Sequence, residues 1–204
     1  MVEQLQSGEI NRKKVSITFD DGYQDFLENA HPVLERFGFT ATVYLPTAFI
    51  GDERRSFKGR PCLTWSEVRQ LQQLGVSFGS HTVTHPQLRE LSTETIREEL
   101  LDSKKAIEDQ TGEPVTSFAY PYAFPETDRS FKAALRDLLA EAGYTSGVCT
   151  TVARASAASD PLFLPRLPVN NDDDQALLSA KLSGAYNWIG SIQSVIKTTK
   201  RIFE

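Results

Sequence analysis

The residues best suited to chemistry are two adjacent aspartates and two closely spaced histidines. Asp20 and Asp21 follow the β-rich run of residues 15–19, and His81 and His85 are two of the chain's three histidines. One carboxylate and two imidazoles can hold Zn²⁺ or a similar divalent ion and leave one coordination position open for water. An open position is typical of a catalytic metal site, so these residues together predict a metal-dependent hydrolytic centre.

The spacing of the two histidines is weak evidence alone, because His-x-x-x-His pairs arise by chance. Pro86 directly follows His85 and disfavours a continuing helix, so we expect a tight loop or a single turn. Neighbouring side chains of an extended segment point in opposite directions. Asp20 and Asp21 can therefore have different roles.

The elements that position these residues alternate between strand-like and helix-like patterns, which is typical of an α/β protein with a parallel sheet. A capping box at Thr64 and an N-cap at Ser92 mark two helix starts. The predicted strands are residues 15–19, 40–45, 76–80, 117–120, 145–149 and an extended stretch at 162–169. The predicted helices are residues 25–37, 65–74, 93–110, 128–142 and 172–182. The chemically suggestive residues follow strand ends, where barrel and open α/β active sites are built.

Length, charge and cysteine content limit the class of protein. At 204 residues the chain is long enough for one well-buried domain and short for two. The net charge of -5 argues against nucleic acid as a partner. Cys62 and Cys149 are too few and too far apart for a disulfide framework, so we interpret them as ordinary thiols. The short basic cluster comprises Arg54, Arg55, Lys58 and Arg60.

Membrane and export signals are also absent from the sequence patterns. No apolar run approaches the roughly 20 residues that span a bilayer, and no signal-like segment precedes the fold. We therefore expect a cytoplasmic protein, or the mature form of an exported one. Residues 186–204 carry apolar side chains at helical spacing and end in basic residues. They predict an amphipathic helix docked on the domain, with a peripheral membrane or protein contact as the alternative.

Three ordered motifs resemble a known family. The segments Thr18–Tyr23, His81–His85 and Phe118–Tyr122 are similar to successive motifs of the polysaccharide deacetylases, the NodB-homology proteins of carbohydrate esterase family 4. The resemblance extends over roughly residues 13–169. It implies a distorted (β/α)7 barrel and a single catalytic domain over residues 1–204. The implied activity is metal-dependent removal of N-acetyl groups from amino sugars, such as N-acetylglucosamine, in a polysaccharide or glycolipid.

The resemblance also implies roles for individual residues. Asp20 would be the general base, and Asp21, His81 and His85 would be the ligands of one divalent ion. Zn²⁺ is the first expectation, with Co²⁺, Ni²⁺ and Mn²⁺ as alternatives. The backbone N–H of Tyr122 would help to stabilise the tetrahedral oxyanion. Such a division is chemically sensible, because a metal polarises the acetyl carbonyl and acidifies water while a carboxylate accepts a proton.

The third motif departs from the family pattern. Many relatives have an arginine before the Pro-Tyr pair, whereas Tyr120 precedes Pro121 and Tyr122 here. We predict that Arg166 replaces it by pairing with Asp20, which would keep the base ionised; the alternative is a surface arginine. The predicted substrate-binding residues of this motif are Tyr120, Pro121 and Phe124.

A second departure concerns the general acid. Many relatives have a late Leu-x-His motif, but this sequence has no histidine after His85. The leaving amine must then receive its proton from Asp20 or from solvent. Slow turnover would follow, because a positioned acid typically contributes about 10² to 10⁴ in rate.

Three rival functions stay open at this point. An O-acetyl esterase or a small-molecule amidohydrolase could use the same centre, since loops select the remainder of the substrate. A weakly active sugar-binding relative is the third, supported by the missing late histidine.

Overall fold

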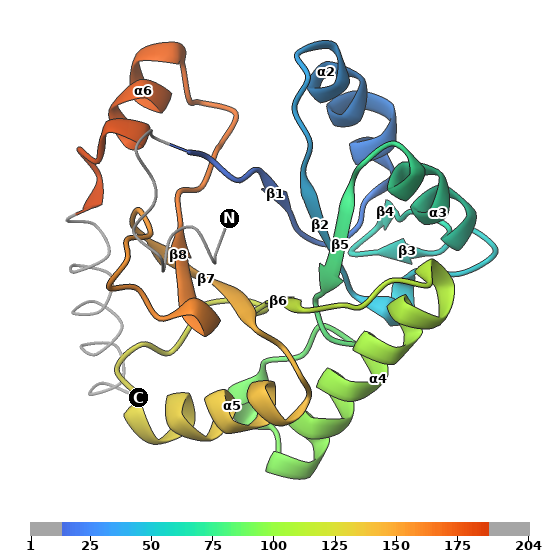
Figure 1. Cartoon of the computed structure of the whole chain (residues 1–204), viewed down its shortest axis with the longest axis vertical. Coiled ribbons are helices and arrows are strands. Elements are labelled where there is room, and N and C mark those ends of the chain that lie inside the picture. Colours follow the sequence, from blue (N-terminus) through green and yellow to red (C-terminus); the bar gives the residue numbers. More distant parts are fainter. Residues whose placement is uncertain (1–13, 188–204) are drawn as a thin grey trace.

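The computed structural model describes residues 14–187, which form a curled parallel sheet with helices around its outer side (Figure 1). The sheet has six strands in the order β1-β2-β5-β6-β7-β8, and every neighbouring pair is parallel. The strands are β1 (Thr18–Phe19), β2 (Thr42–Leu45), β5 (Ser77–Ser80), β6 (Ser117–Ala119), β7 (Ser146–Val152) and β8 (Leu164–Arg166). The predicted α/β fold with a curled, barrel-like sheet is confirmed.

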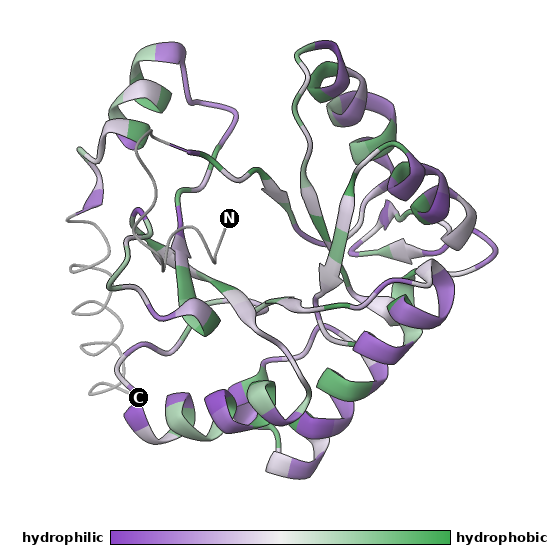
Figure 2. Cartoon of the chain, in the orientation of Figure 1, coloured by the Kyte–Doolittle hydropathy of each residue, from purple (hydrophilic) through white to green (hydrophobic). Residues whose placement is uncertain are grey.

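The helices follow the strands along the chain and cover the convex side of the sheet (Figure 1). The longer ones are α2 (His31–Arg36), α3 (Trp65–Gln73), α4 (Thr93–Thr111), α5 (Arg129–Glu141) and α6 (Gln175–Ser183). The shorter turns are η1 (Phe26–Ala30), η2 (Thr47–Phe49), η3 (Leu88–Glu90) and η4 (Pro161–Phe163). Hydrophilic and hydrophobic residues alternate along α4 and α5, as expected of helices that pack one face on a sheet (Figure 2).

Local sequence signals explain where several helices begin and end. The Thr64 hydroxyl accepts the N–H of Glu67, and the Glu67 carboxylate accepts the N–H of Thr64, so the predicted capping box is present. Ser92 caps α4, and Gly112 ends it with a φ of 72°. Asp174 is the N-cap of α6, so this helix begins later than the predicted start at residue 172.

The segment predicted as one helix over residues 25–37 is instead a π-helical turn, η1, followed by α2. His31 donates its N–H to the carbonyl of Phe26, five residues back. Pro32 has no N–H to continue the regular pattern at this point, which explains the irregular turn. β1 is also shorter than the predicted strand over 15–19, because it is an edge strand that pairs only with β2.

One element was missed by the sequence patterns. β3 (Ser56–Phe57) and β4 (Arg60–Pro61) form a separate antiparallel hairpin. Its strands have two residues each, too short for an alternating pattern to indicate them. The hairpin lies in the connection between η2 and α3 and carries Lys58 and Arg60 of the basic cluster, while Arg54 and Arg55 directly precede it.

A single hydrophobic cluster fills the space between the sheet and the helices. Gly79 allows β5 to lie tightly between its neighbours, since a Cβ there would be 2.6 Å from the Tyr44 ring and 2.8 Å from the Ser117 carbonyl oxygen. This close packing fixes the strand that ends at Ser80, directly before His81. Cys62 and Cys149 are buried free thiols, as predicted. Fully buried side chains of the cluster include Val43, Leu45, Leu71, Leu100, Phe118, Leu135 and Leu139.

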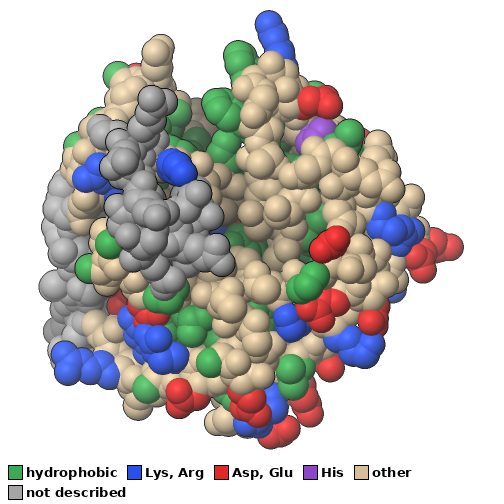
Figure 3. Space-filling model, viewed as in Figure 1, with side chains coloured by type: hydrophobic (Ala, Val, Ile, Leu, Met, Phe, Trp, Pro, Cys, Tyr) green, Lys and Arg blue, Asp and Glu red, His purple; other side chains and the backbone are tan. Residues whose placement is uncertain are grey.

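Charges of both signs are interspersed over the face drawn in Figure 3. Within residues 14–187, no helix is both long and apolar enough to cross a bilayer. The amphipathic segment predicted at about 186–204 lies, from residue 188 onward, outside the described residues, so its docking or peripheral contact stays a prediction. The assignment of residues 1–204 to one catalytic domain likewise stays a prediction.

Candidate active site

The predicted site residues lie at the carboxyl ends of the parallel strands. Asp20 and Asp21 follow β1, His81 follows β5, and Tyr122 lies in the loop after β6. Arg166 is the last residue of β8. Because parallel strands present their carboxyl ends at the same edge, residues up to 146 positions apart in sequence meet there.

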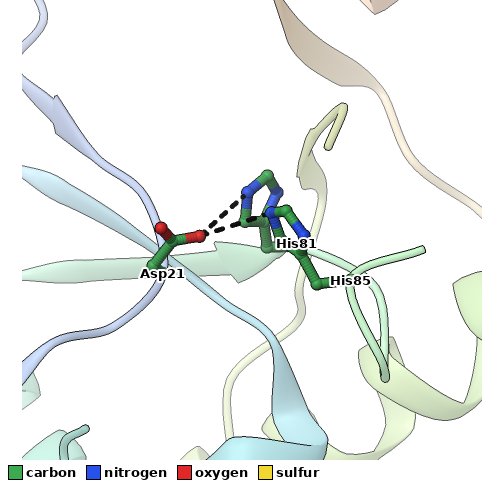
Figure 4. A group of neighbouring side chains, drawn as sticks. All are labelled: Asp21, His81 and His85. Atoms are coloured by element: carbon green, nitrogen blue, oxygen red, sulfur yellow. Dashed lines mark ion pairs between the residues drawn. The ribbon is translucent and has the colours of Figure 1, made fainter. Parts of the chain in front are cut away.

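Asp21, His81 and His85 converge on one point (Figure 4). The Asp21 Oδ1 atom lies 3.5 Å from Nε2 of His81 and 3.4 Å from Nε2 of His85. The potential ligand atoms of the three residues all lie within 4.8 Å of one another. Within residues 14–187, this is the group of ligand-type side chains that could hold a metal ion.

The hydrogen bonding of these residues fits a divalent cation. The carbonyl of Ala119, 2.7 Å away, accepts the Nδ1 proton of His81 and leaves its Nε2 lone pair directed at Asp21. Asp21 Oδ1 is buried and has no hydrogen-bond partner within the described part of the chain. A buried carboxylate oxygen without a partner is costly, and a bound cation would satisfy it.

Both imidazoles are neutral near pH 7, the form that binds metal. Burial lowers the pKa of His81 more than the nearby Asp20 and Asp21 carboxylates raise it. Burial, followed by the charges of His81 and Lys58, lowers the pKa of His85 to about 4. At neutral pH each ring therefore has one nitrogen without a proton, which is free to bind a cation.

The loop that carries His85 is clamped by a carboxylate from α4. Glu99 accepts hydrogen bonds from the N–H groups of Val83 and Thr84 at 2.7 and 2.9 Å, and from the Thr84 hydroxyl at 2.6 Å. Thr82 and His85 have φ values of 68° and 57°, a conformation that L-residues adopt at a cost. The Glu99 contacts offset that cost and hold His85 toward Asp21.

Arg166 pairs with Asp20, which confirms the predicted contact. Its Nη1 donates to Asp20 Oδ1 at 2.7 Å, and its Nη2 donates to Oδ2 at 2.8 Å, a bidentate geometry. Burial would raise the pKa of Asp20, but the Arg166 hydrogen bonds and the charges of His81 and Arg166 lower it overall. The Asp20 carboxylate is therefore ionised at neutral pH and lies next to the metal-ligand group.

Tyr122 borders the site from the loop after β6. Its ring makes an edge contact with the His85 ring, with centroids 4.6 Å apart, and its φ is 58°. Thr150 of β7 holds this loop: its hydroxyl donates to the Tyr122 carbonyl at 3.0 Å and accepts the Phe124 N–H at 2.9 Å. One side chain thus fixes the backbone on both sides of Ala123.

The three residues predicted to bind substrate are buried, and all three line one cavity. Tyr120 and Phe124 are only 3% and 1% exposed and pack against each other, with centroids 4.9 Å apart. Together with Tyr122 they line a cavity of about 370 Å³, and the three ligand residues are not part of its lining. Pro121 lines the same cavity. The other lining residues are Gln87, Arg89, Glu90, Ala123, Pro125, Glu126 and Thr127.

Sequence reasoning missed Glu99, Thr150 and Lys58 of the hairpin. Glu99 and Thr150 act through loops that follow other strands, so no local pattern marks them. Lys58 was included only as a member of a basic cluster. A Lys-Gly dipeptide between short extended runs was the available signal for a turn there.

Comparison with known proteins identifies the family. Residues 7–147 match the family described as polysaccharide deacetylase. YxkH of Bacillus subtilis (strain 168) is 31% identical over 176 residues, which cover 86% of this chain and 57% of YxkH. The chain therefore belongs to the polysaccharide deacetylase family, which is carbohydrate esterase family 4 with its NodB-homology domain. Members of this family generally use a divalent metal ion.

Two further relatives agree with this assignment. The poly-beta-1,6-N-acetyl-D-glucosamine N-deacetylase of Staphylococcus aureus (strain MSSA476) is 23% identical over 182 residues, which cover 85% of this chain and 60% of that protein. The structure of the Streptococcus pyogenes deacetylase PplD in complex with acetate has a TM-score of 0.77 and 28% identity, covering 89% of this chain and 76% of PplD. The chain spans 57% and 60% of the length of the two curated relatives.

The two hydrogen bonds of the Thr150 hydroxyl lead to a first prediction. Replacing Thr150 with Val keeps its shape but removes the hydroxyl that bonds the Tyr122 carbonyl and the Phe124 N–H. We expect the free energy of unfolding to fall by about 0.5–1.5 kcal/mol, the usual net contribution of a hydrogen bond. We also expect faster hydrogen exchange at the Phe124 amide. Urea unfolding and exchange measured by NMR test both effects.

Two variants control this experiment. Thr150→Ser keeps the hydroxyl and should retain most of the protection at Phe124. Thr145→Val makes the same chemical change at an exposed position just before β7. Equal effects of Val and Ser at position 150 would show that packing, and not the hydroxyl, holds the loop.

Proposed function

We propose that this protein is a metal-dependent hydrolase that removes N-acetyl groups from amino sugars of the N-acetylglucosamine type in a polysaccharide or glycolipid. The observation that carries the proposal is the buried, unpartnered Asp21 Oδ1 facing two imidazole nitrogens, with the Arg166-bound Asp20 carboxylate beside it. The related S. aureus protein is named for N-deacetylation of a glucosamine polymer, and PplD was solved with acetate. Both names support an acetyl group as the part removed.

In this proposal Asp21, His81 and His85 hold one divalent ion, with Zn²⁺ as the first candidate and Co²⁺, Ni²⁺ and Mn²⁺ as alternatives. A bound ion would supply Lewis-acid polarisation and a water of lowered pKa, near about 7 for zinc. The protein supplies the orientation: the Ala119 carbonyl fixes the tautomer of His81, and Glu99 fixes the loop of His85.

Asp20 would accept the proton of the attacking water, because Arg166 holds it ionised and in a fixed orientation. The carbonyl oxygen of the acetyl group gains negative charge as the water adds. The backbone N–H of Tyr122 would donate to that oxygen; within residues 14–187 it makes no other hydrogen bond. Protonated Asp20 would then return the proton to the leaving nitrogen.

A second candidate is hydrolysis of an O-acetyl ester. The observation in its favour is the absence of a histidine after His85, because an alcohol leaves more readily than an amine without a separate acid. The same three ligands and the same base would serve either substrate. Acetate release must therefore be measured from both an amide and an ester substrate.

Metal binding can be predicted residue by residue. We expect wild-type protein to bind one divalent ion per chain, and Asp21→Asn or His85→Gln to weaken binding by more than about 100-fold, since each removes a direct ligand. Equilibrium dialysis with elemental analysis measures the stoichiometry and affinity. His31→Gln, which removes the third histidine away from the triad, should bind as wild type does. Unchanged binding by the Asp21 variant would contradict the ligand assignment.

Catalysis is tested by acetate release from N-acetylglucosamine oligomers and from an acetyl ester by metal-loaded protein. Asp20→Asn should retain the metal but lose about 10² to 10⁴ in rate, the usual contribution of a positioned base. Rates are compared at equal metal occupancy, so that the base and the ligands are tested separately. Equal acetate from wild type and Asp20→Asn would refute the proposed mechanism.

The Asp20–Arg166 pair predicts a pH effect. The base works when ionised, so activity is present above its pKa and falls as the pH drops through it. Arg166→Met removes the hydrogen bonds that lower this pKa and leaves burial, which raises it. We expect the acidic limb of the kcat/KM profile to move to higher pH by about 1–3 units.

Two variants separate this effect from a loss of folding. Arg166→Lys keeps the charge without the bidentate geometry and should shift the limb less. Arg69→Met, which changes an exposed arginine of α3, should leave the profile unchanged. An acidic limb that does not move in Arg166→Met would mean that this arginine does not control Asp20.

A further inference from the structure

The β3–β4 hairpin presents a lysine at its tip. Lys58 and Gly59 connect the two strands and have φ values of 49° and 76°. Two consecutive positive φ values are typical of the type I′ turn that fits a tight hairpin. Asn, Asp or Gly usually occupies the first of these positions, so a lysine there is held in an unfavourable conformation.

The Lys58 ammonium lies against two aromatic rings of the active site. Its Nζ is 4.6 Å from the centroid of the Phe57 ring and 4.8 Å from that of the Tyr122 ring. Each of these rings also contacts the His85 ring, at centroid distances of 4.9 and 4.6 Å. One layer of aromatic side chains therefore separates a fixed positive charge from a candidate metal ligand.

The other residues of the basic cluster each have an ion-pair or hydrogen-bond partner. Arg54 pairs with Glu67, Arg55 donates to the Ala48 carbonyl, and Arg60 pairs with Asp25. Lys58 is exposed, and no carboxylate in the described part of the chain forms an ion pair with it. Among the described residues, Lys58 is therefore a cation without an ion-pair partner at the border of the site, in a protein with a net charge of -5.

We propose that Lys58 determines substrate specificity by charge: it favours N-acetylated glycans that bear a carboxylate on the sugar next to the acetylated one. The inference rests on the proposed deacetylase function and adds a substrate class to it. An ammonium attracts a carboxylate that reaches the exposed edge of Tyr122, and it repels cationic groups. Each deacetylation creates an amine that is positively charged near pH 7. Lys58 would therefore also disfavour rebinding of product and of chains that already carry free amines.

The test compares two forms of one oligosaccharide. The first alternates N-acetylglucosamine with glucuronic acid, and the second has each carboxylate converted to its primary amide, so that only the charge differs. For wild type we expect kcat/KM to be about three- to fivefold higher on the carboxylate form at low ionic strength, the size of one exposed ion pair. The ratio should approach one at about 1 M salt, where the Debye length is about 3 Å.

Variants assign the preference to Lys58. Lys58→Met keeps an unbranched side chain over the rings but removes the charge, and its ratio should be close to one at every ionic strength. Lys58→Arg should keep the preference. Lys105→Met removes an equal charge from the exposed side of α4 and should behave as wild type does. If Lys58 only stabilised the hairpin, Lys58→Met would lower the rates on both substrates equally and leave their ratio unchanged.

The outcomes separate this inference from the proposed function. Acetate released from both substrates with the same ratio in wild type and Lys58→Met would overturn the role of Lys58 and leave the deacetylase proposal intact. If no variant releases acetate, the deacetylase proposal fails. Calorimetric titration of the two oligosaccharides into wild type and Lys58→Met then decides the Lys58 inference without turnover: a carboxylate preference lost in the variant supports it, and equal binding overturns it.

Discussion

The ion pair between Asp20 and Arg166 is the interaction on which the rest of the site depends. β1 and β8 are the two edge strands of the sheet, and the pair joins the chain directly after β1 to the last residue of β8. Arg166 also donates to the Thr18 hydroxyl and to the Cys149 carbonyl. A partly buried charge is costly unless it is paired and hydrogen-bonded, and here each partner satisfies the other. The contact that brings the edge strands together thus also sets the charge of Asp20.

The strained backbone of this protein is concentrated around the same centre. Of the five non-glycine residues with positive φ in residues 14–187, Asp21, Thr82, His85 and Tyr122 belong to the three motifs, and Lys58 lies over Tyr122. Each such residue costs about 1–2 kcal/mol. The surrounding hydrogen bonds offset that cost, and they come from α4 for one loop and from β7 for the other. Contacts from α4 and β7 therefore hold the backbone of the loops that carry His85 and Tyr122.

The sequence predicted the parts of the fold that depend on local signals. The capping box at Thr64, the cap at Ser92 and most strand positions follow from propensity and periodicity. The Asp20–Arg166 contact was predicted because the third motif lacks the arginine that many relatives have there. The hairpin was missed because its strands have only two residues each. Glu99 and Thr150 could not be predicted, because they contact loops that follow other strands. The deep burial of Tyr120 and Phe124 was missed for a related reason. A Pro-rich loop resembles an exposed one until α5 and β7 are placed against it.

The absence of a histidine after His85 bears on the role of the Asp20–Arg166 ion pair. In the proposed reaction one residue must first accept a proton and later donate it. A carboxylate with a lowered pKa is a weaker base, but its protonated form is a stronger acid. By lowering the pKa of Asp20, Arg166 would therefore make this residue a weaker base and, once protonated, a stronger acid in the proposed reaction. A bound metal ion would lower the pKa of water, so that a weak base would suffice. The lowered pKa of Asp20 would then favour the second half of the proposed reaction, in which the leaving amine must be protonated. In the proposed reaction the adjacent aspartates would divide the chemistry: Asp21 would help to hold the cation, and Asp20 would carry the proton in both directions.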